Sequence, residues 1–394
     1  MPSRTDRGPY LTGWAHSQFG RLDEHTLESL ITSVAREALD CAGLIPADVD
    51  EIVLGHYNAG MTALTFPSSL ALELDDTLRF TPATRVENAC ATGSAALHTA
   101  LRSVRSGDAR VVLVIGAEKM TGIPPSTVGR ALLGADYHLA GTLSEVGFTG
   151  LFAQVAEAYI DRYGDIRDEM AHVASKNHSN GVANPYAQIR RELDIDFCRE
   201  ISKQNPIVAA PLRRTDCSPI SDGAAALVVT TKDLAASAPQ SVQIRGYGHA
   251  NDFLPSPRRD PLAFAAAHRA WNYATDSANV TLSDLDLVEL HDCFTIAEIL
   301  LYEVIGLTEP GQGRRAINDG WVFKDGQLPI NPSGGLKSKG HPIGATGVSQ
   351  HVLAAMQLTD TAGGMQIPGS RLAGVFNMGG LAVANYATIL ERAT

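Results

Sequence analysis

The sequence predicts an α/β protein built from two similar halves. Apolar runs of strand length alternate with longer segments of helical periodicity along most of the 394 residues, which is typical of strands buried between helices. Each half also shows the same succession: a strand, a turn bearing Gly or Cys, a helix rich in small residues, and a closing strand with Gly at its end. We therefore expect one α/β unit to occur twice in the chain.

In the first half, the periodicity predicts two helices and two strands around a turn that contains Cys90. The segment before Cys90 is extended, and the segment after it is rich in Ala, Ser and Gly with helical spacing, so the thiol opens a helix. The predicted elements are, in order, helix Thr26–Ala42, strand Glu51–Leu54, helix Ser94–Arg105 and strand Arg110–Ile115.

The second half begins near Val242 and repeats the alternation. Short apolar runs indicate buried strands, and apolar residues three and four apart indicate helices. The predicted elements are strand Val242–Tyr247, helix Pro261–Thr275, strand Leu287–Leu290, helix Ile296–Ile305, helix Gly347–Gln357 and strand Leu372–Phe376.

A more polar segment, rich in His and Asn, separates these two patterns. It returns to the first sheet through the apolar run at 221–230. We predict a first half at 1–119 with 212–236, an inserted loop domain at 120–211, and a second half at 237–394. Insertions of this length in α/β enzymes often hold substrate, although a purely structural excursion is the alternative.

Composition narrows the classes of partner. The chain is 44% hydrophobic, and its 43 acidic residues outnumber 32 basic ones for a net charge of -11, with no basic tract among aromatics, which argues against nucleic acid as a partner. No apolar run is long enough to cross a bilayer. The five cysteines form no C-x-x-C pair, so we expect neither disulfides nor a zinc knuckle. We therefore expect the protein to be located in the reducing cytoplasm.

Cys90 is the first candidate for chemistry. The free amides and the positive dipole end of a helix start favour thiolate over thiol, and thiolate is the reactive form. A buried structural cysteine fits the same local pattern equally well. Residues far downstream decide between the two interpretations.

Two downstream segments offer partners for this thiol. His341 lies in a loop dense in Gly and Pro, where backbone can approach a ligand closely, and a nucleophilic cysteine needs a base or cation beside it. His291, Asp292 and Cys293 follow a predicted strand, at the usual position of a ligand crevice. Adjacent residues seldom converge on one ion, so we predict no metal site there.

A third segment is the turn after the last predicted strand, within Gly374–Gly380. The backbone N–H groups of such a turn can stabilise a developing oxyanion. An ordinary strand-ending glycine turn is the alternative interpretation.

Taken together, the dispersed motifs resemble the thiolase superfamily, and more closely its sterol-carrier-protein-type branch with the His-Asp-Cys-Phe motif. The likeness implies two βαβαβαββ halves packed in a five-layer αβαβα arrangement with an inserted loop domain. The motifs that carry it are Asn88–Ser94, Lys176–His178, Asn184–Gln188, Cys217–Gly223, His291–Phe294 and Gly340–Gly347.

The resemblance also implies roles for the candidate residues. Cys90 resembles the nucleophile that takes an acyl group from acyl-CoA, and His341 resembles its activator and a donor in the oxyanion hole for the enolate. His291 stands where most thiolases carry an Asn, so it is expected to hold the water that completes that hole. A second hole would use the backbone amides of Cys90 and Gly379.

Two departures from the family pattern affect the chemistry. Asn377 stands where thiolases commonly carry the acid/base cysteine, and in the resembling branch Cys293 can supply that thiol. Phe148, Thr149 and Phe152 occupy the region where many thiolases carry a His-Met pair, so the acyl specificity stays open.

The resemblance predicts reversible CoA-dependent thiolytic cleavage of a 3-oxoacyl-CoA, or the reverse Claisen condensation, through acyl-Cys90. CoA is then a substrate, and no bound cofactor is expected. A thiolase-like aldolase acting on a β-hydroxyacyl-CoA, or a noncatalytic acyl-CoA or lipid-binding relative, are the alternatives. The family also implies a homodimer or dimer of dimers, with a small zinc-containing OB-fold protein as a further partner.

Overall fold

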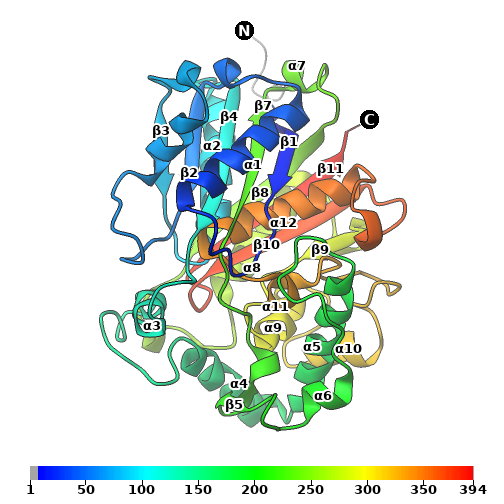
Figure 1. Cartoon of the computed structure of the whole chain (residues 1–394). Helices are drawn as coiled ribbons and strands as arrows, with labels where there is room; N and C mark the ends of the chain where they lie inside the picture. The colour runs from blue at the N-terminus through cyan, green and yellow to red at the C-terminus, as the bar shows by residue number, and fades with distance from the viewer. Residues whose placement is uncertain (1–7, 394) are drawn as a thin grey trace.

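The computed structural model describes residues 8–393, and its centre is one continuous mixed sheet (Figure 1). The strand order across this sheet is β3-β2-β4-β7-β1-β8-β11-β10-β9. The strands are β1 Tyr10–His16, β2 Glu51–Gly55, β3 Ala83–Val86, β4 Val111–Glu118, β7 Gly223–Thr230, β8 Val242–Asn251, β9 Leu287–Glu289, β10 Leu372–Gly379 and β11 Ala384–Arg392.

The two ends of the sheet repeat one topology. In the first half β1 pairs antiparallel with β7, β7 antiparallel with β4, and β4 parallel with β2. The pairs β8–β11, β11–β10 and β10–β9 follow the same sequence of directions. In the first half, β3 adds a parallel strand next to β2. At the corresponding place in the second half, Ile330 forms a single parallel bridge to Val288 of β9. This repetition confirms the predicted duplication.

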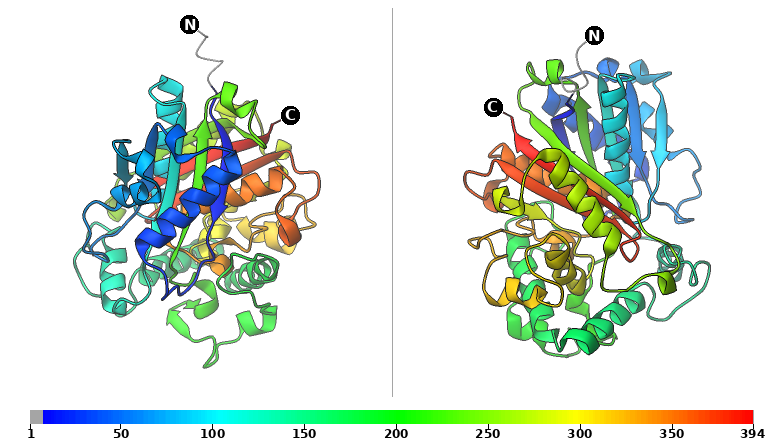
Figure 2. Two further views of the ribbon diagram at one scale, coloured as in Figure 1. Left: turned by 45° about the horizontal axis from the view of Figure 1, so that its top comes forward. Right: turned by 180° about the vertical axis from the view of Figure 1, so that it is seen from behind.

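Helices complete five layers. Helix α1 (Leu27–Ala42) covers β1, β7 and β4, and α8 (Ala265–Ala278) covers β8 and β11 on the opposite outer face, as the rear view in Figure 2 shows. Helices α2 (Thr92–Ser106) and α12 (Ile343–Leu358) pack against each other between the half-sheets. The αβαβα arrangement is therefore as predicted.

Residues 120–211 lie at one end of the sheet, beside short elements of the second half (Figure 1). Helix α5 (Arg167–Val182) packs against α9 (Thr295–Val304) and α11 (Gly335–Lys339) there. The predicted domain boundaries stay a prediction. The elements of this region are α3 Pro125–Leu133, α4 Thr149–Tyr163, α5 Arg167–Val182, α6 Ile195–Arg199, β5 Ile207–Ala209 and, just after it, β6 Leu212–Arg213; the neighbouring helices are α9 Thr295–Val304, α10 Gly313–Asn318 and α11 Gly335–Lys339, and α7 is Lys232–Ala235.

Most predicted elements occur, with errors at their ends. The helix predicted from Pro261 begins only at Ala265, because Phe264 has a left-handed backbone (φ 41°) that interrupts the pattern. The helix predicted from Gly347 begins at Ile343, directly after Pro342. The sequence patterns missed β1 and β11. These two strands lie on either side of β8 near the middle of the sheet.

The contact between α2 and α12 positions the site. At Gly93, a Cβ would lie only 2.7 Å from the backbone nitrogen of Val348 and 2.8 Å from that of Gly347. Only glycine allows this approach without displacing backbone. The N-terminal ends of the two helices therefore meet, which brings the turn before α2 next to the loop before α12. Among residues 8–393, no helix combines the length and apolarity required to cross a membrane.

Candidate active site

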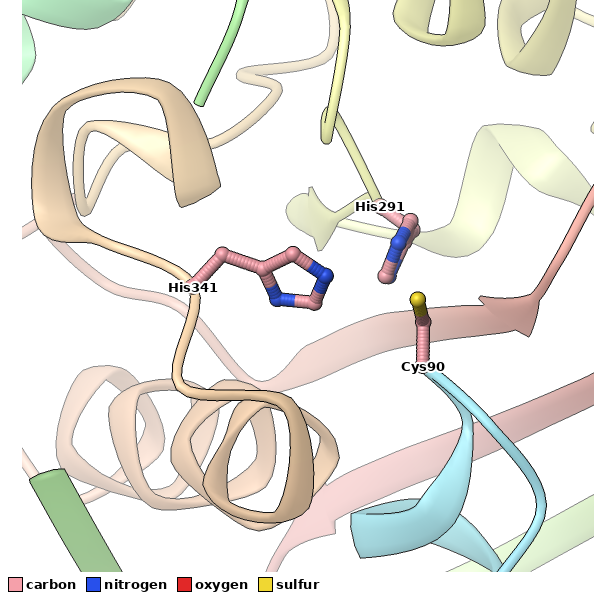
Figure 3. A group of neighbouring side chains, drawn as sticks. All are labelled: Cys90, His291 and His341. Atoms are coloured by element: carbon pink, nitrogen blue, oxygen red, sulfur yellow. The ribbon is translucent and has the colours of Figure 1, made fainter. Parts of the chain in front are cut away.

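Three predicted side chains converge where the two helix starts meet. A ligand atom from each of Cys90, His291 and His341 lies within 4.8 Å of the other two. The imidazole rings stand edge to face, with centroids 5.1 Å apart, and Figure 3 shows the sulfur pointing toward them. The three residues come from the turn before α2, the loop after β9 and the loop before α12. The fold thus joins segments that are far apart in the sequence.

The turn that carries Cys90 is tightly constrained. Ala89 has a positive φ of 50°, which is uncommon for a residue with a side chain. The amides of Ala91 and Thr92 donate to the carbonyls of Asn88 and Ala89, and the Asn88 amide donates to the Thr92 hydroxyl. The helix begins at Thr92, two residues before its predicted start, and the thiol stands just outside it.

The sulfur of Cys90 is a thiol at rest. Burial raises the pKa of Cys90 to about 11, although backbone amides of Gly380 and Cys90 hydrogen-bond the sulfur and oppose that rise. The backbone amides thus act in the predicted direction, but burial has the larger effect on the pKa of Cys90. The Gly380 amide belongs to the predicted glycine turn, and the oxyanion hole expected from the amides of Cys90 and Gly379 stays a prediction.

His341 presents a bare nitrogen to the site. Its Nδ1 lies 2.6 Å from the Thr346 hydroxyl oxygen, and that hydroxyl donates its single proton to the carbonyl of Pro342. The network therefore assigns the ring proton to Nδ1, while the buried Nε2 has no hydrogen-bond partner among the described residues. Burial, and then the Lys339 ammonium, lower the pKa of His341 to about 3. This imidazole is neutral and can accept a proton.

His291 has the opposite tautomer. The Asn377 amide nitrogen donates to Nδ1 of His291 at 2.8 Å and to the Cys90 carbonyl at 3.2 Å. A carbonyl only accepts, which fixes the orientation of the amide and places the His291 proton on Nε2. Burial, and then His341 and Lys339, lower the pKa of His291 well below its usual value. One neutral imidazole accepts at Nε2 and its neighbour donates.

Buried acidic side chains hold the loops that carry these rings. Asp292 accepts from the amides of Leu336 and Lys337 at 2.6 and 3.1 Å and from the Asn177 side chain at 2.8 Å. Burial, followed by the nearby Glu298, raises the pKa of Asp292 to about 7. Asp292 therefore organises backbone and does not face the three reactive atoms.

Two further buried groups were not found by the sequence reasoning. Glu118, at the end of β4, accepts from the amides of Tyr57 and Gly344 at 2.8 and 3.0 Å and so joins the loop before α12 to the first half. Lys339 is fully buried, and its ammonium has no partner among the described residues. For Glu118, the available signal was a charged residue at the end of an apolar strand.

Cys293 lines the same cavity as Cys90. This cavity, of about 320 Å³, is lined in part by Phe148, Thr149 and Cys217. Burial raises the pKa of Cys293 well above its usual value, and Cys90 adds to that rise. Phe152 lies behind the wall, stacked on Phe294 with ring centroids 4.5 Å apart. Cys90, Cys293 and His341 thus line one apolar cavity, and His291 lies next to Cys90 and His341.

The reactive atoms also have the spacing of a metal site. Cys90, His291 and His341 offer one thiol and two imidazole nitrogens, a ligand set that suits Zn²⁺. The predicted absence of a metal stays a prediction.

Family comparison identifies the architecture. Residues 12–233, more than half of the chain, match the family described as thiolase, N-terminal domain. The chain belongs to the thiolase family. Residues 248–392 of this thiolase match the family described as thiolase C-terminal domain-like. Both halves of the protein thus have counterparts in the family.

Individual relatives agree with this assignment. The acetyl-CoA acetyltransferase of Methanothermobacter thermautotrophicus is 36% identical to this thiolase over 370 residues, covering 93% of this chain and 95% of the relative. Sterol carrier protein 2 of Oryctolagus cuniculus is 32% identical over 320 residues, covering 76% of this chain and 56% of that protein. A solved structure described as "Ltp2-ChsH2(DUF35) aldolase" superposes with a TM-score of 0.79 at 21% identity, covering 98% of each chain. These matches confirm the thiolase resemblance and fold.

Proposed function

We propose that this thiolase cleaves a 3-oxoacyl-CoA with CoA, or runs the reverse Claisen condensation, through an acyl-Cys90 intermediate. One observation carries the proposal: a buried thiol and the bare Nε2 of a neutral imidazole face one another in an apolar cavity. That arrangement suits covalent catalysis by a cysteine activated at the moment of attack. The acetyl-CoA acetyltransferase relative supports the same reaction class.

The first half-reaction uses the Cys90 and His341 pair. His341 Nε2 takes the thiol proton as the sulfur attacks the 3-oxo carbon of the substrate. The C2–C3 bond then breaks, leaving the shortened acyl group on Cys90 and the enolate of acetyl-CoA or another short acyl-CoA. The N–H of His291 and the protonated His341 donate to the developing oxyanions, and such donation commonly lowers the barrier to acyl transfer substantially.

Cys293 serves as the acid and then the base. Its thiol protonates the enolate carbon, and the resulting thiolate takes the proton of the incoming CoA thiol. CoA sulfur attacks acyl-Cys90, the Cys90 sulfur leaves, and His341 returns its proton to it. The raised pKa of Cys293 suits a group that keeps its proton until a basic enolate appears.

Mass spectrometry after incubation with acetyl-CoA tests this assignment. We expect one acetyl group on Cys90, no label in Cys90→Ala, and a normal label in Cys293→Ala, with thiolysis and condensation reduced by about 10²–10⁴-fold. Cys217→Ala is the matched control, since Cys217 lines the same cavity without a proposed role. Full Claisen activity in Cys293→Ala would refute the acid/base assignment.

An aldolase is the second candidate, because the solved aldolase structure shares the fold. Cleavage of a β-hydroxyacyl-CoA requires no acyl-cysteine, so the facing Cys90 and His341 favour thiolysis. Hydroxyacyl-CoA cleavage that survives Cys90→Ala would establish the aldolase instead. Failure of every acyl-CoA to label Cys90, with binding retained, would favour a noncatalytic acyl-CoA-binding relative.

For its assembly, we propose a homodimer or dimer of dimers in the cytoplasm, acting with a small zinc-containing OB-fold protein. The description of the aldolase structure, which names ChsH2(DUF35) beside Ltp2, supports a protein partner. Light scattering of the purified chain tests the oligomer. To test the partner, the chain is purified from its source, and we expect a small zinc-containing protein to co-purify with it at fixed stoichiometry.

A further inference from the structure

A second cavity lies among α5, α6 and α11, and its lining is positively charged. It has a volume of about 450 Å³ and shares no lining residue with the cavity of Cys90. Four of its lining side chains are basic and none is acidic, in a chain whose net charge is -11. The basic residues are Arg191, Lys203, Arg214 and Lys337. Such a concentration of one sign attracts ligands of the opposite sign.

Lys337 is the buried member of this group. Its residue is only 3% exposed, and among the described residues its ammonium makes no hydrogen bond or ion pair. The acidic groups nearby are bound elsewhere: Asp216 to Arg213 and Thr295, and Asp292 to backbone amides. Asp216 and Asp292 act on Lys337 through space without contacting its ammonium. Because a buried charge is costly without a direct partner, an anion in this cavity would stabilise Lys337.

His178 adds a second unpartnered group to the wall. It is 1% exposed, and its Nδ1 has no hydrogen-bond partner within residues 8–393. Its ring donates to the backbone carbonyl of Arg191, which leaves Nδ1 as an acceptor when the ring is neutral. A ligand with anionic oxygens and a hydroxyl would match both Lys337 and His178.

We propose that this cavity binds the phosphate group of a small hydroxyl-bearing phosphate ester, with Lys337 as the buried anchor and Arg191, Lys203 and Arg214 at the rim. Guanidinium forks bind phosphate oxygens in pairs, and a lysine ammonium acts as a point charge. The phosphate belongs either to a separate metabolite or to CoA itself. The binding site is independent of whether the acyl-transfer proposal holds.

Titration calorimetry of the full chain with inorganic pyrophosphate tests the site. At about 0.1 M salt, where exposed charges are already partly screened, we expect one site per chain. Arg191→Gln with Lys203→Gln should weaken binding by at least about tenfold, and Lys337→Met should weaken it further. If the Lys337 variant does not fold, the variant of the exposed residues Arg191 and Lys203 still tests the site. Arg79→Gln with Arg85→Gln, an exposed pair on the first half, is the matched control and should bind normally.

Absence of pyrophosphate binding, or equal binding by the Arg191/Lys203 and control variants, would overturn the proposal. Repeating the titration in saturating CoA identifies the source of the phosphate. Undiminished pyrophosphate binding supports a separate metabolite, and loss of binding supports the phosphates of CoA. Because the readout is binding, its failure is distinguishable from a failure of acyl transfer.

Discussion

At the scale of single residues, two identical side chains receive opposite functions from their hydrogen-bond partners. Thr346 fixes the proton of His341 on Nδ1, and Asn377 fixes that of His291 on Nε2. One ring therefore faces the site as an acceptor and the other as a donor. Asn377, noted in the sequence only for lacking a thiol, supplies the second of these assignments.

The resting state of Cys90 leads to a pH prediction. Because its pKa is raised to about 11 from 9.0, the free enzyme at pH 8 should contain about a hundredfold less Cys90 thiolate than an ordinary thiol. Alkylation by iodoacetamide should be slow at pH 7 and rise about tenfold per pH unit toward pH 11. Subtracting the rate measured for Cys90→Ala isolates this residue. A rate that is already constant above pH 7 would contradict the prediction.

Asn377→Asp should alter catalysis through His291. A carboxylate only accepts, so His291 would move its proton to Nδ1 and lose the donor at Nε2. We expect kcat to fall by about 10²–10³-fold with a small change in KM, as for loss of one oxyanion donor. Steady-state kinetics measure both constants.

Asn385→Asp is the matched control for that variant. Asn385 is also fully buried, and its amide also donates to backbone carbonyls, those of Ala250 and Ala382. It should lose stability without the same fall in kcat. Equal losses of kcat in both variants would assign Asn377 a purely structural role.

At the scale of elements, the meeting of α2 and α12 determines the site geometry. Gly93→Ala should destabilise the protein by about 1–3 kcal/mol, because the new methyl group overlaps backbone of α12. Denaturant unfolding measures the change. Gly129→Ala, in helix α3 with nothing within 4 Å of the added Cβ, should instead be neutral or stabilising by up to about 1 kcal/mol. Similar losses in both would show that close helix contact is not the cause.

Element prediction succeeded where one face or both faces of an element are apolar. The all-buried strands β4 and β7 were recognisable because their eight residues include few polar ones. The start of α8 was wrong because a left-handed Phe264 leaves no local signal. Strand β11 directly follows its partner β10, but its other partner, β8, is distant in sequence, and the local pattern does not indicate that pairing.

At the scale of the whole molecule, a buried ion pair joins residues 120–211 to the second half. Lys176 lies 2.8 Å from Glu298, and both are essentially inaccessible to solvent. Asn177 and Asn331 donate to the same carboxylate at 2.6 and 2.9 Å. The Lys176-Asn177 motif of the sequence therefore positions the inserted region against the His291 loop.

Lys176→Met should destabilise the protein by about 3–5 kcal/mol, because it leaves the Glu298 carboxylate buried without its cation. Adding Glu298→Gln removes that charge at nearly constant shape and should restore at least about 1 kcal/mol. Equilibrium unfolding of both single variants and the double variant completes the cycle. Strictly additive losses would show that the pair contributes nothing as a pair.

The sequence alone determined the α/β class, the duplication, the family resemblance and the four side chains that lie close together at the site. Those inferences depend on spacing and motif order, which are local properties of the chain. The tertiary structure decided the protonation and tautomer of each group. Burial raises the pKa of Cys90 to about 11, and the Asn377 donor that orients His291 lies 86 residues away from it. Desolvation and hydrogen bonding depend on neighbours in space, which no local pattern of residues specifies.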